Sequence, residues 1–145
     1  MYNQLKLDNQ LCFRLYTASR LLTQAYNPLL KPLGLTYPQY LVMMVLWEKD
    51  NQIVSDLCSR LMLDTNTVTP ILQRMERQGL VVRSRGVVDG RQTLVSLSRA
   101  GRALEEKAKD VPSCLTANLM QTKVGNGQLA TTVETLDKLI AALGH

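Results

Sequence analysis

Cys12 is the residue of this chain whose type and position best suit covalent chemistry. It lies in the stretch Leu7–Tyr26, where apolar residues recur at spacings of three and four and predict one face of a helix. A thiolate placed on such a helix is a nucleophile that peroxides can oxidise to a sulfenic acid. A buried, unreactive thiol is the alternative, because free cysteine is among the most buried residue types. The residues alone leave both interpretations open.

The other two cysteines, Cys58 and Cys114, form no CxxC pair or Cys/His cluster, and the only histidine is His145. The odd number and wide spacing of the cysteines argue against a structural zinc site and against a secreted disulfide scaffold. We therefore expect reduced thiols in a cytoplasmic protein, with no metal and no cofactor. Cys58 lies between leucines and is expected in the core.

Length and composition predict one domain over residues 1–145 with a substantial core. Hydrophobic residues make up 46% of the chain, which argues against disorder. The net charge of +5 fits a polyanionic partner but is weak evidence alone. The N-terminus lacks the pattern of a signal peptide, and the longest apolar run, Tyr40–Trp47, is too short to cross a bilayer. We expect no membrane association.

Capping residues and apolar runs predict the helices that follow. Thr36 as N-cap and Pro38 in the first turn begin a second helix, whose buried body is Tyr40–Trp47. Residues 48–51 are expected to form a loop. A short third helix is predicted from about Ser55, as its cap, to Leu61.

A fourth helix is predicted to begin at residues 64–67 and to end at Gly79 as its C-cap. Its buried face follows from four apolar residues with helical spacing, namely Val68, Ile71, Leu72 and Met75. Pro70 lacks an amide hydrogen and prefers the first turn of a helix. It therefore predicts either a later helix start or a local kink.

A β-hairpin is predicted next. Leu80–Arg83 and Gln92–Leu97 are prone to form strands, and glycine and aspartate at 86–90 mark the turn between them. Ser98 is then placed to cap a helix, which Pro112 interrupts.

Two helices followed by a hairpin predict a mostly α-helical winged helix-turn-helix over about residues 36–100, with the wing near 80–97. The second of these helices would enter the major groove of double-stranded DNA. Gln73 can read adenine and Arg74 can read guanine, whereas Arg77 is placed for phosphate. The full set of candidate contacts on this helix is Thr65, Asn66, Thr67, Thr69, Pro70, Gln73, Arg74 and Arg77.

The hairpin carries three candidate DNA contacts, Arg83, Arg85 and Arg91. Asp89 lies beside Arg91 and can hold its guanidinium in one orientation for a narrow minor groove. The alternative is that these charges form an ordinary solvated face.

Both ends of the chain carry long apolar stripes, at Leu7–Leu22 and Leu129–Leu143. A helix-turn-helix does not need these flanking helices for its own core. We expect the segments at about 1–30 and 112–145 to form a homodimer. Two-fold symmetry would then place two recognition helices about one DNA turn apart, roughly 34 Å, on an inverted-repeat operator. The alternative is that the stripes close the core of a monomer.

These residues resemble the MarR family of dimeric winged-helix regulators, and Asp89-Gly90-Arg91 fits its Asp-x-Arg wing signature. Within that family, Leu7–Phe13 and Gly34–Met43 look like the organic hydroperoxide sensor branch, OhrR. Leu63-Asp64 and Thr67–Leu72 are similar to the recognition helix of that branch, which makes Pro70 a family feature.

The resemblance implies a redox-sensing repressor, with Cys12 as the thiol that organic hydroperoxides oxidise. It implies that Tyr26 and Tyr37 donate hydrogen bonds to the sulfur of Cys12, and Tyr16 lies one helical turn from Cys12 and could line the same pocket. Cys114 resembles the resolving cysteine that closes an intersubunit disulfide. Oxidation would then release the operator and allow expression of a peroxide-detoxifying gene.

Two other functions stay open at this point. A regulator of the same family could respond to a non-covalent aromatic ligand between its helices. A thiol peroxidase would turn over with a reductant, but no second cysteine lies close to Cys12 in the sequence and a wing has no place in such an enzyme. We therefore expect a protein that is not an enzyme.

Overall fold

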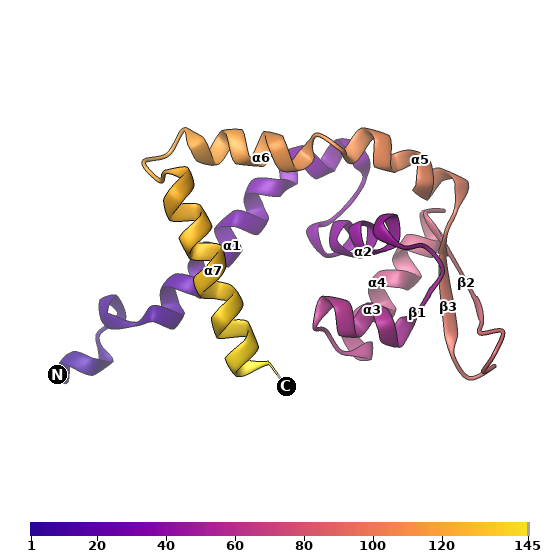
Figure 1. Ribbon diagram of the computed structural model, residues 1–145, viewed down its shortest axis with the longest axis horizontal. Coiled ribbons are helices and arrows are strands. Elements are labelled where there is room, and N and C mark those ends of the chain that lie inside the picture. The colour runs from indigo at the N-terminus through magenta and orange to yellow at the C-terminus, as the bar shows by residue number, and fades with distance from the viewer. Residues whose placement is uncertain (145) are drawn as a thin grey trace. The chain divides into compact units, whose positions relative to one another are not determined.

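The structure is a computed structural model that describes residues 1–144 (Figure 1). His145, the last residue of the predicted domain and dimerisation segment, lies outside the described residues. The chain has two compact units, Met1–Lys109 and the part that begins at Asp110.

The first unit begins with helix α1, which spans Leu11–Leu30. The helix predicted over Leu7–Tyr26 therefore starts and ends later than expected. It starts later because Gln10 is extended and its side-chain amide donates to the carbonyls of Gln4 and Lys6, each at 2.8 Å, which holds the preceding 3-10 turns. It continues past Pro28, and its last residue is buried in the core.

Helix α2, Tyr37–Glu48, starts as the sequence predicts. The Gln39 backbone N–H donates to Thr36 Oγ1 at 3.4 Å, and the Thr36 N–H donates to Gln39 Oε1 at 3.2 Å. These two bonds form a capping box, which satisfies two backbone donors at the helix start. The apolar run in this helix supplies much of the core of the unit, including Met43 and Leu46.

Helix α3 (Val54–Leu61) and helix α4 (Thr65–Arg77) form the helix-turn-helix. The prediction that Ser55 caps α3 was wrong, because the N-cap is Ile53 and the helix starts one residue before Ser55. Asp64 caps α4 by accepting the Thr67 N–H at 2.9 Å. Helix α4 runs from Thr65 through Pro70, so the later start considered for this helix does not occur.

The first unit also contains a three-stranded antiparallel sheet, in the order β1-β3-β2, whose strand β1 precedes α3. The predicted hairpin is confirmed as β2 (Val81–Arg85) and β3 (Thr93–Leu97). Strand β1 (Gln52–Ile53) was not predicted, because two residues are too few to show an alternating pattern. Its pairing with β3 fixes the start of α3 to the wing strands.

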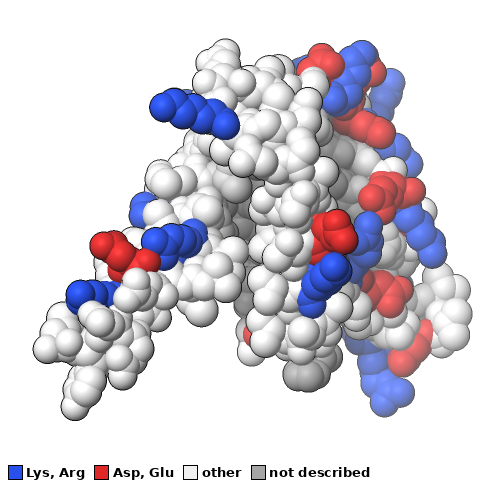
Figure 2. Space-filling model, turned by 60° about the vertical axis from the view of Figure 1, so that its left-hand side comes forward, with Lys and Arg blue, Asp and Glu red and all other residues white. Residues whose placement is uncertain are grey.

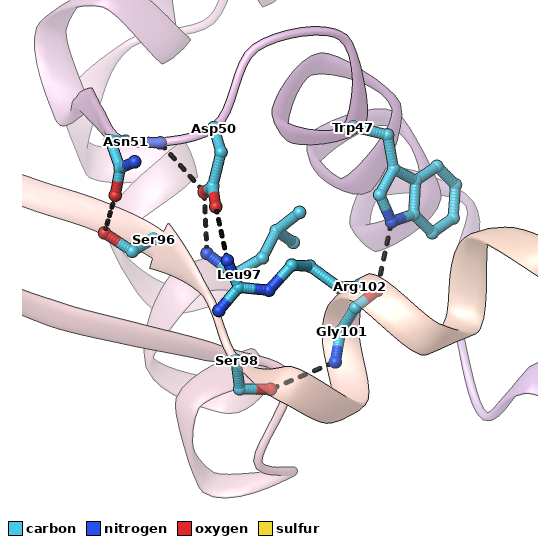
Figure 3. A network of polar contacts seen from close by, with 8 residues as sticks. All are labelled: Trp47, Asp50, Asn51, Ser96, Leu97, Ser98, Gly101 and Arg102. Atoms are coloured by element: carbon cyan, nitrogen blue, oxygen red, sulfur yellow. Dashed lines mark hydrogen bonds and ion pairs between the residues drawn. The ribbon is translucent and has the colours of Figure 1, made fainter.

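Helix α5, Arg99–Ala108, closes the first unit and is capped by Ser98, as predicted. A polar network at its start joins α2, β3 and α5 (Figure 3). Asp50 Oδ1 accepts the Leu97 N–H at 2.8 Å, and Asp50 Oδ2 lies 3.6 Å from Arg102 Nη1. The base of the wing is therefore fixed to the two helices on either side of it.

The second unit contains helix α6 (Val111–Met120) and helix α7 (Asn126–Leu143). Pro112 lies in the first turn of α6, a position that proline tolerates, and so it separates α5 from α6 as expected. None of the helices within residues 1–144 has the length and apolar character needed to cross a bilayer.

Candidate functional site

Helix α4 presents a polar surface on one face and contributes to the core with the other. Val68, Leu72 and Met75 are fully buried against α2 and α3. The predicted contact residues lie on the remaining surface, where Thr69 is half-buried and the others are exposed: Thr65, Asn66, Thr67, Pro70, Gln73, Arg74 and Arg77. The predicted division of this helix into a buried and an outward face is confirmed, except that Ile71, which was predicted on the buried face, is only half-buried.

Cys58 lies at the junction of the two helices of the motif. Its Sγ atom is 3.9 Å from Thr65 Oγ1, at the start of α4. The prediction of a core position was wrong, because Cys58 is half-buried and its neighbour Leu57 takes the core position on α3.

The wing tip carries the arginine that the sequence singled out. Asp89 Oδ1 accepts both the backbone N–H of Arg91 at 3.0 Å and its Nε–H at 3.3 Å. The Arg91 side chain is 93% exposed. The expected orientation of this guanidinium by Asp89 is therefore present in the chain without DNA. Arg85 is also exposed.

Arg83 was expected to be free to contact DNA, but its side chain is bound within the protein. Its backbone N–H donates to Glu76 Oε2 at 2.9 Å, and its guanidinium Nη2 donates to Glu76 Oε1 at 3.1 Å. Only 27% of its side chain is exposed. Arg83 therefore ties strand β2 to the last turn of α4, and Glu76 is a residue that sequence reasoning missed.

Cys12 lies in the first turn of α1 and is exposed in the single chain. The surface of α1 around it is equally uncovered and holds many large apolar side chains. Figure 2 shows residues that are neither basic nor acidic over much of the face that it draws. The exposed large apolar residues of this helix are Leu11, Phe13, Leu15, Tyr16, Leu21 and Leu22. A cluster of exposed large apolar residues on one helix is typical of an interface.

An aromatic cluster lies where the end of α1 meets the start of α2. The ring centroids of Tyr26 and Tyr37 are 4.7 Å apart, and that of Tyr40 is 5.7 Å from Tyr26. Tyr40 is followed along α2 by Trp47, 6.5 Å away, whose Nε1–H donates to the Gly101 carbonyl at 3.0 Å. Trp47 is half-buried, so the core position predicted for it is only partly reached.

The environment of this cluster keeps its hydroxyl groups protonated. Burial raises the pKa of Tyr26, and the nearby Tyr37 and Tyr40 hydroxyls raise it further. Burial also raises the pKa of Tyr37. Both groups are therefore neutral hydrogen-bond donors at physiological pH.

The chain does not bring Cys12 to its expected hydrogen-bond donors. Cys12 and Tyr26 lie on the same continuous helix, fourteen positions apart. At about 1.5 Å of rise per residue, their backbones are separated by about 21 Å along α1. A hydrogen bond between these two side chains within one chain is impossible, whereas Tyr16 lies one turn from Cys12 on the same helix.

In the second unit, Cys114 is exposed in the first half of α6. Helix α7 presents large exposed apolar residues along its length: Val133, Ile140 and Leu143. Residues 1–144 contain no group of three or more metal-ligating side chains.

Comparison with known proteins identifies the family. The family described as "Transcriptional regulator SarA/Rot" matches residues 24–108. The "Organic hydroperoxide resistance transcriptional regulator" of Bacillus subtilis is 44% identical over 135 residues, which cover 93% of this chain and 92% of that protein.

Solved structures agree with these sequence matches. Reduced AbfR bound to DNA is 35% identical, with a TM-score of 0.78, over 97% of this chain and 95% of that one. AbfR of Staphylococcus epidermidis is also solved as a disulfide form, at 36% identity and a TM-score of 0.66, over 94% of each chain. Helix-turn-helix, wing and flanking helices thus have counterparts across nearly the whole chain. The chain belongs to the MarR and SarA-type family of winged-helix transcriptional regulators.

Proposed function

We propose that this protein is a dimeric, DNA-binding repressor that is released from an inverted-repeat operator when organic hydroperoxides oxidise Cys12. The observation that carries the proposal is the position of Cys12: an exposed thiol on a largely apolar, uncovered helix of a winged-helix regulator. Transcription of a peroxide-detoxifying gene would follow release. The 44% identity to a regulator named for organic hydroperoxide resistance supports the choice of oxidant.

The hydrogen-bond donors for Cys12 come from the second subunit in this proposal. Tyr26 is about 21 Å from Cys12 along the rigid helix α1, so the same chain cannot supply it. A two-fold dimer formed through the exposed apolar faces of α1 and α7 would place Cys12 of one subunit beside the partner's Tyr26 and Tyr37. Neutral tyrosine hydroxyls donate to a thiolate and favour it over the thiol.

Oxidation then proceeds in two balanced steps. The Cys12 thiolate attacks one oxygen of the hydroperoxide, the O–O bond breaks, and an alcohol leaves after it takes up a proton, with Cys12 as a sulfenic acid. The thiol of Cys114 from the partner subunit then attacks the Cys12 sulfur. A disulfide forms and water leaves, and the two electrons given up by the two thiols reduce the peroxide to alcohol and water.

Disulfide formation across the dimer would change the spacing of the two recognition helices. The similar protein AbfR has been solved overoxidized while bound to DNA, and separately as a disulfide form. This pair of states favours the disulfide, rather than oxygen addition alone, as the step that releases DNA. A tenfold fall in affinity requires only about 1.4 kcal/mol of difference between the two states.

The proposal is tested by fluorescence anisotropy of the reduced protein on DNA from its own upstream region, before and after one equivalent of an organic hydroperoxide. Intact mass is measured in parallel without reductant. Release together with a covalent dimer supports the two-cysteine mechanism. Release as a monomer with added oxygen or a small thiol removes Cys114 from it.

Two remaining outcomes distinguish the other functions. Tight DNA binding that ignores peroxide would make Cys12 structural and point to a non-covalent ligand. Steady peroxide consumption with a thiol reductant, in the absence of DNA binding, would indicate a thiol peroxidase instead.

A further inference from the structure

A hollow of about 290 Å³ lies between the recognition helix and the wing. Segments far apart in the sequence line it: Ile53 of β1, the start of α3, helix α4 and the β2–β3 hairpin. The polar side chains that line it are Ser55, Thr65, Thr69, Arg83, Gln92 and Thr93. Arg91 also reaches its rim from the wing tip.

The geometry of duplex DNA determines what must pass over this hollow. The major groove, about 12 Å wide, and the adjacent minor groove, about 6 Å wide, are separated by one sugar-phosphate strand. If α4 lies in the major groove and the wing tip enters the neighbouring minor groove, that strand lies between them. The hollow occupies this position, because α4 forms one side of it and the wing the other.

The hollow offers hydrogen-bond donors that have no other use in the chain. Within residues 1–144, the hydroxyls of Ser55, Thr69 and Thr93 donate no hydrogen bond to the protein, so they are free to donate to a ligand in the hollow. Hydroxyl donors of this kind commonly bind phosphate oxygens in protein–DNA complexes.

The two arginines of the hollow are each already held by a carboxylate. Arg83 donates to Glu76 at 3.1 Å, and the Arg91 guanidinium lies 3.3 Å from Asp89 Oδ1. The charge available to a phosphate inside the hollow is therefore largely compensated. Contact there depends on neutral donors, which release few counterions and so add little to the salt dependence of binding.

We propose that this hollow binds one backbone phosphodiester of the operator through the neutral hydroxyls of Thr93, Thr69 and Ser55. The contact fixes the register of the recognition helix relative to the wing, without reading a base. The proposal rests on the DNA-binding function proposed above and adds a phosphate site to the residues that the sequence suggested.

The test compares Thr93→Val, which removes the hydroxyl and keeps the shape, with Thr93→Ser, which keeps the hydroxyl. The probe is the tightest-binding duplex recovered by selection from a random pool with the reduced wild-type protein. A series of duplexes then carries a single neutral methylphosphonate at each position of the strand between the two grooves.

Three results are expected, for the affinity, its salt dependence and its response to methylphosphonate. Thr93→Val binds roughly threefold to tenfold more weakly, which corresponds to the loss of one neutral hydrogen bond, and Thr93→Ser binds like the wild type. The salt slope of Thr93→Val is unchanged, whereas Arg85→Ala lowers it by about one phosphate contact. At the one position where the methylphosphonate replaces the phosphate that Thr93 contacts, Thr93→Val lowers the affinity no further, because that contact is already lost.

The proposal would be overturned if Thr93→Val bound DNA with unchanged affinity, or if Thr93→Val and Thr93→Ser lost affinity equally. It would also be overturned if the loss of affinity from Thr93→Val multiplied the loss from the methylphosphonate at every position. A folding defect is recognised separately, because the thermal midpoint of Thr93→Val would then fall below that of Thr93→Ser. Thr69→Val in the same series then tests the site without a change in the wing. Failure of the wild-type protein to enrich any duplex would instead reject the proposed DNA-binding function.

Discussion

Arg83 donates three hydrogen bonds to Glu76, one from its backbone N–H at 2.9 Å and two from its guanidinium at 3.3 and 3.1 Å. Glu76 lies in the last turn of α4, and Arg83 lies in the middle of β2. One carboxylate therefore holds both the backbone and the side chain of the wing strand. The angle between recognition helix and wing, on which simultaneous contact with two grooves depends, is fixed by this pair.

Glu76→Gln is expected to weaken operator binding severalfold while leaving the fold intact. The amide cannot accept three hydrogen bonds from Arg83 with the strength of a carboxylate, so the wing becomes less well positioned. The measurement is anisotropy on the selected duplex, with circular dichroism as the check on folding.

Glu48→Gln is the matched control, because Glu48 also pairs with an arginine, Arg60, but both side chains are more than 60% exposed, at 64% and 62%. Exposed pairs of this kind contribute little. Equal losses for Glu76→Gln and Glu48→Gln would contradict a specific role for the Glu76–Arg83 pair.

The same pair predicts a dependence of stability on acid. The hydrogen bonds from the backbone N–H and then the side chain of Arg83 lower the pKa of Glu76 below its ordinary value. A lowered pKa in the folded state means that the stabilisation is present above the unfolded value of about 4.3 and is lost as the pH falls through the folded value. The thermal midpoints of the wild type and Glu76→Gln should therefore differ at neutral pH and converge in acid. A constant difference at all pH values would count against this assignment.

Gly101→Ala is expected to destabilise the first unit. A Cβ at Gly101 would lie 2.2 Å from the backbone carbonyl oxygen of Leu80, which cannot move without shifting the base of the wing. Insertion of a methyl group into such a site costs about 1–3 kcal/mol. Urea unfolding measures the loss. Gly90→Ala is the control, since nothing lies within 4 Å of the added Cβ. A loss from Gly90→Ala as large as that from Gly101→Ala would indicate a general effect of the substitution.

Local signals in the sequence were sufficient for most of the fold. The predicted cap residues Thr36 and Ser98 bind the backbone donors that such residues usually bind, and Gly79 takes the left-handed conformation that ends α4. The resemblance to MarR regulators also held, because the matched family and relatives extend over most of the chain. Each of these features depends on residues close together in sequence or on a whole-chain pattern.

What the sequence did not predict depends on contacts between distant segments. The two-residue strand β1 exists only through its pairing with β3, so its own composition carries no signal. The role of Arg83 is set by Glu76, and a glutamate on a charged helix end looks like any solvated residue.

Cys12→Ser is expected to keep operator affinity and to lose the response to peroxide. The serine hydroxyl has the shape of the thiol but is not oxidised, while the α4 and wing surfaces are unchanged. Cys58→Ser is the control, because Cys58 contacts the start of α4 and not α1. Anisotropy with one equivalent of hydroperoxide measures both variants. Release of Cys12→Ser as fast as the wild type would reject Cys12 as the sensor.

Cys114→Ser separates the two steps of oxidation. Cys12 should still gain oxygen, because the first step does not use Cys114, but no covalent dimer should form. Intact mass and a non-reducing gel measure the two events. A covalent dimer that persists in Cys114→Ser would assign the second sulfur to another cysteine.

The separation of Cys12 from Tyr26 along α1 makes the dimer itself testable through mixed subunits. A homodimer of Tyr26→Phe/Tyr37→Phe lacks the hydroxyl donors and should be oxidised about tenfold more slowly, since hydrogen bonds to a charged group contribute more than neutral ones. In a heterodimer with Cys12→Ser, the only Cys12 belongs to the subunit that carries the phenylalanines. Because the donors come from the other subunit, this Cys12 should react at the wild-type rate.

Intact-mass time courses on heterodimers with one tagged subunit measure this rate directly. The reverse arrangement is the control: a subunit that carries Cys12→Ser, Tyr26→Phe and Tyr37→Phe together is paired with a wild-type subunit. The only Cys12 then faces phenylalanines and should react as slowly as in the homodimer that lacks the hydroxyls. If instead the first heterodimer reacts slowly and the reverse one reacts at the wild-type rate, the tyrosines act on Cys12 of their own chain. The continuous helix α1, with about 21 Å between Cys12 and Tyr26, does not permit this.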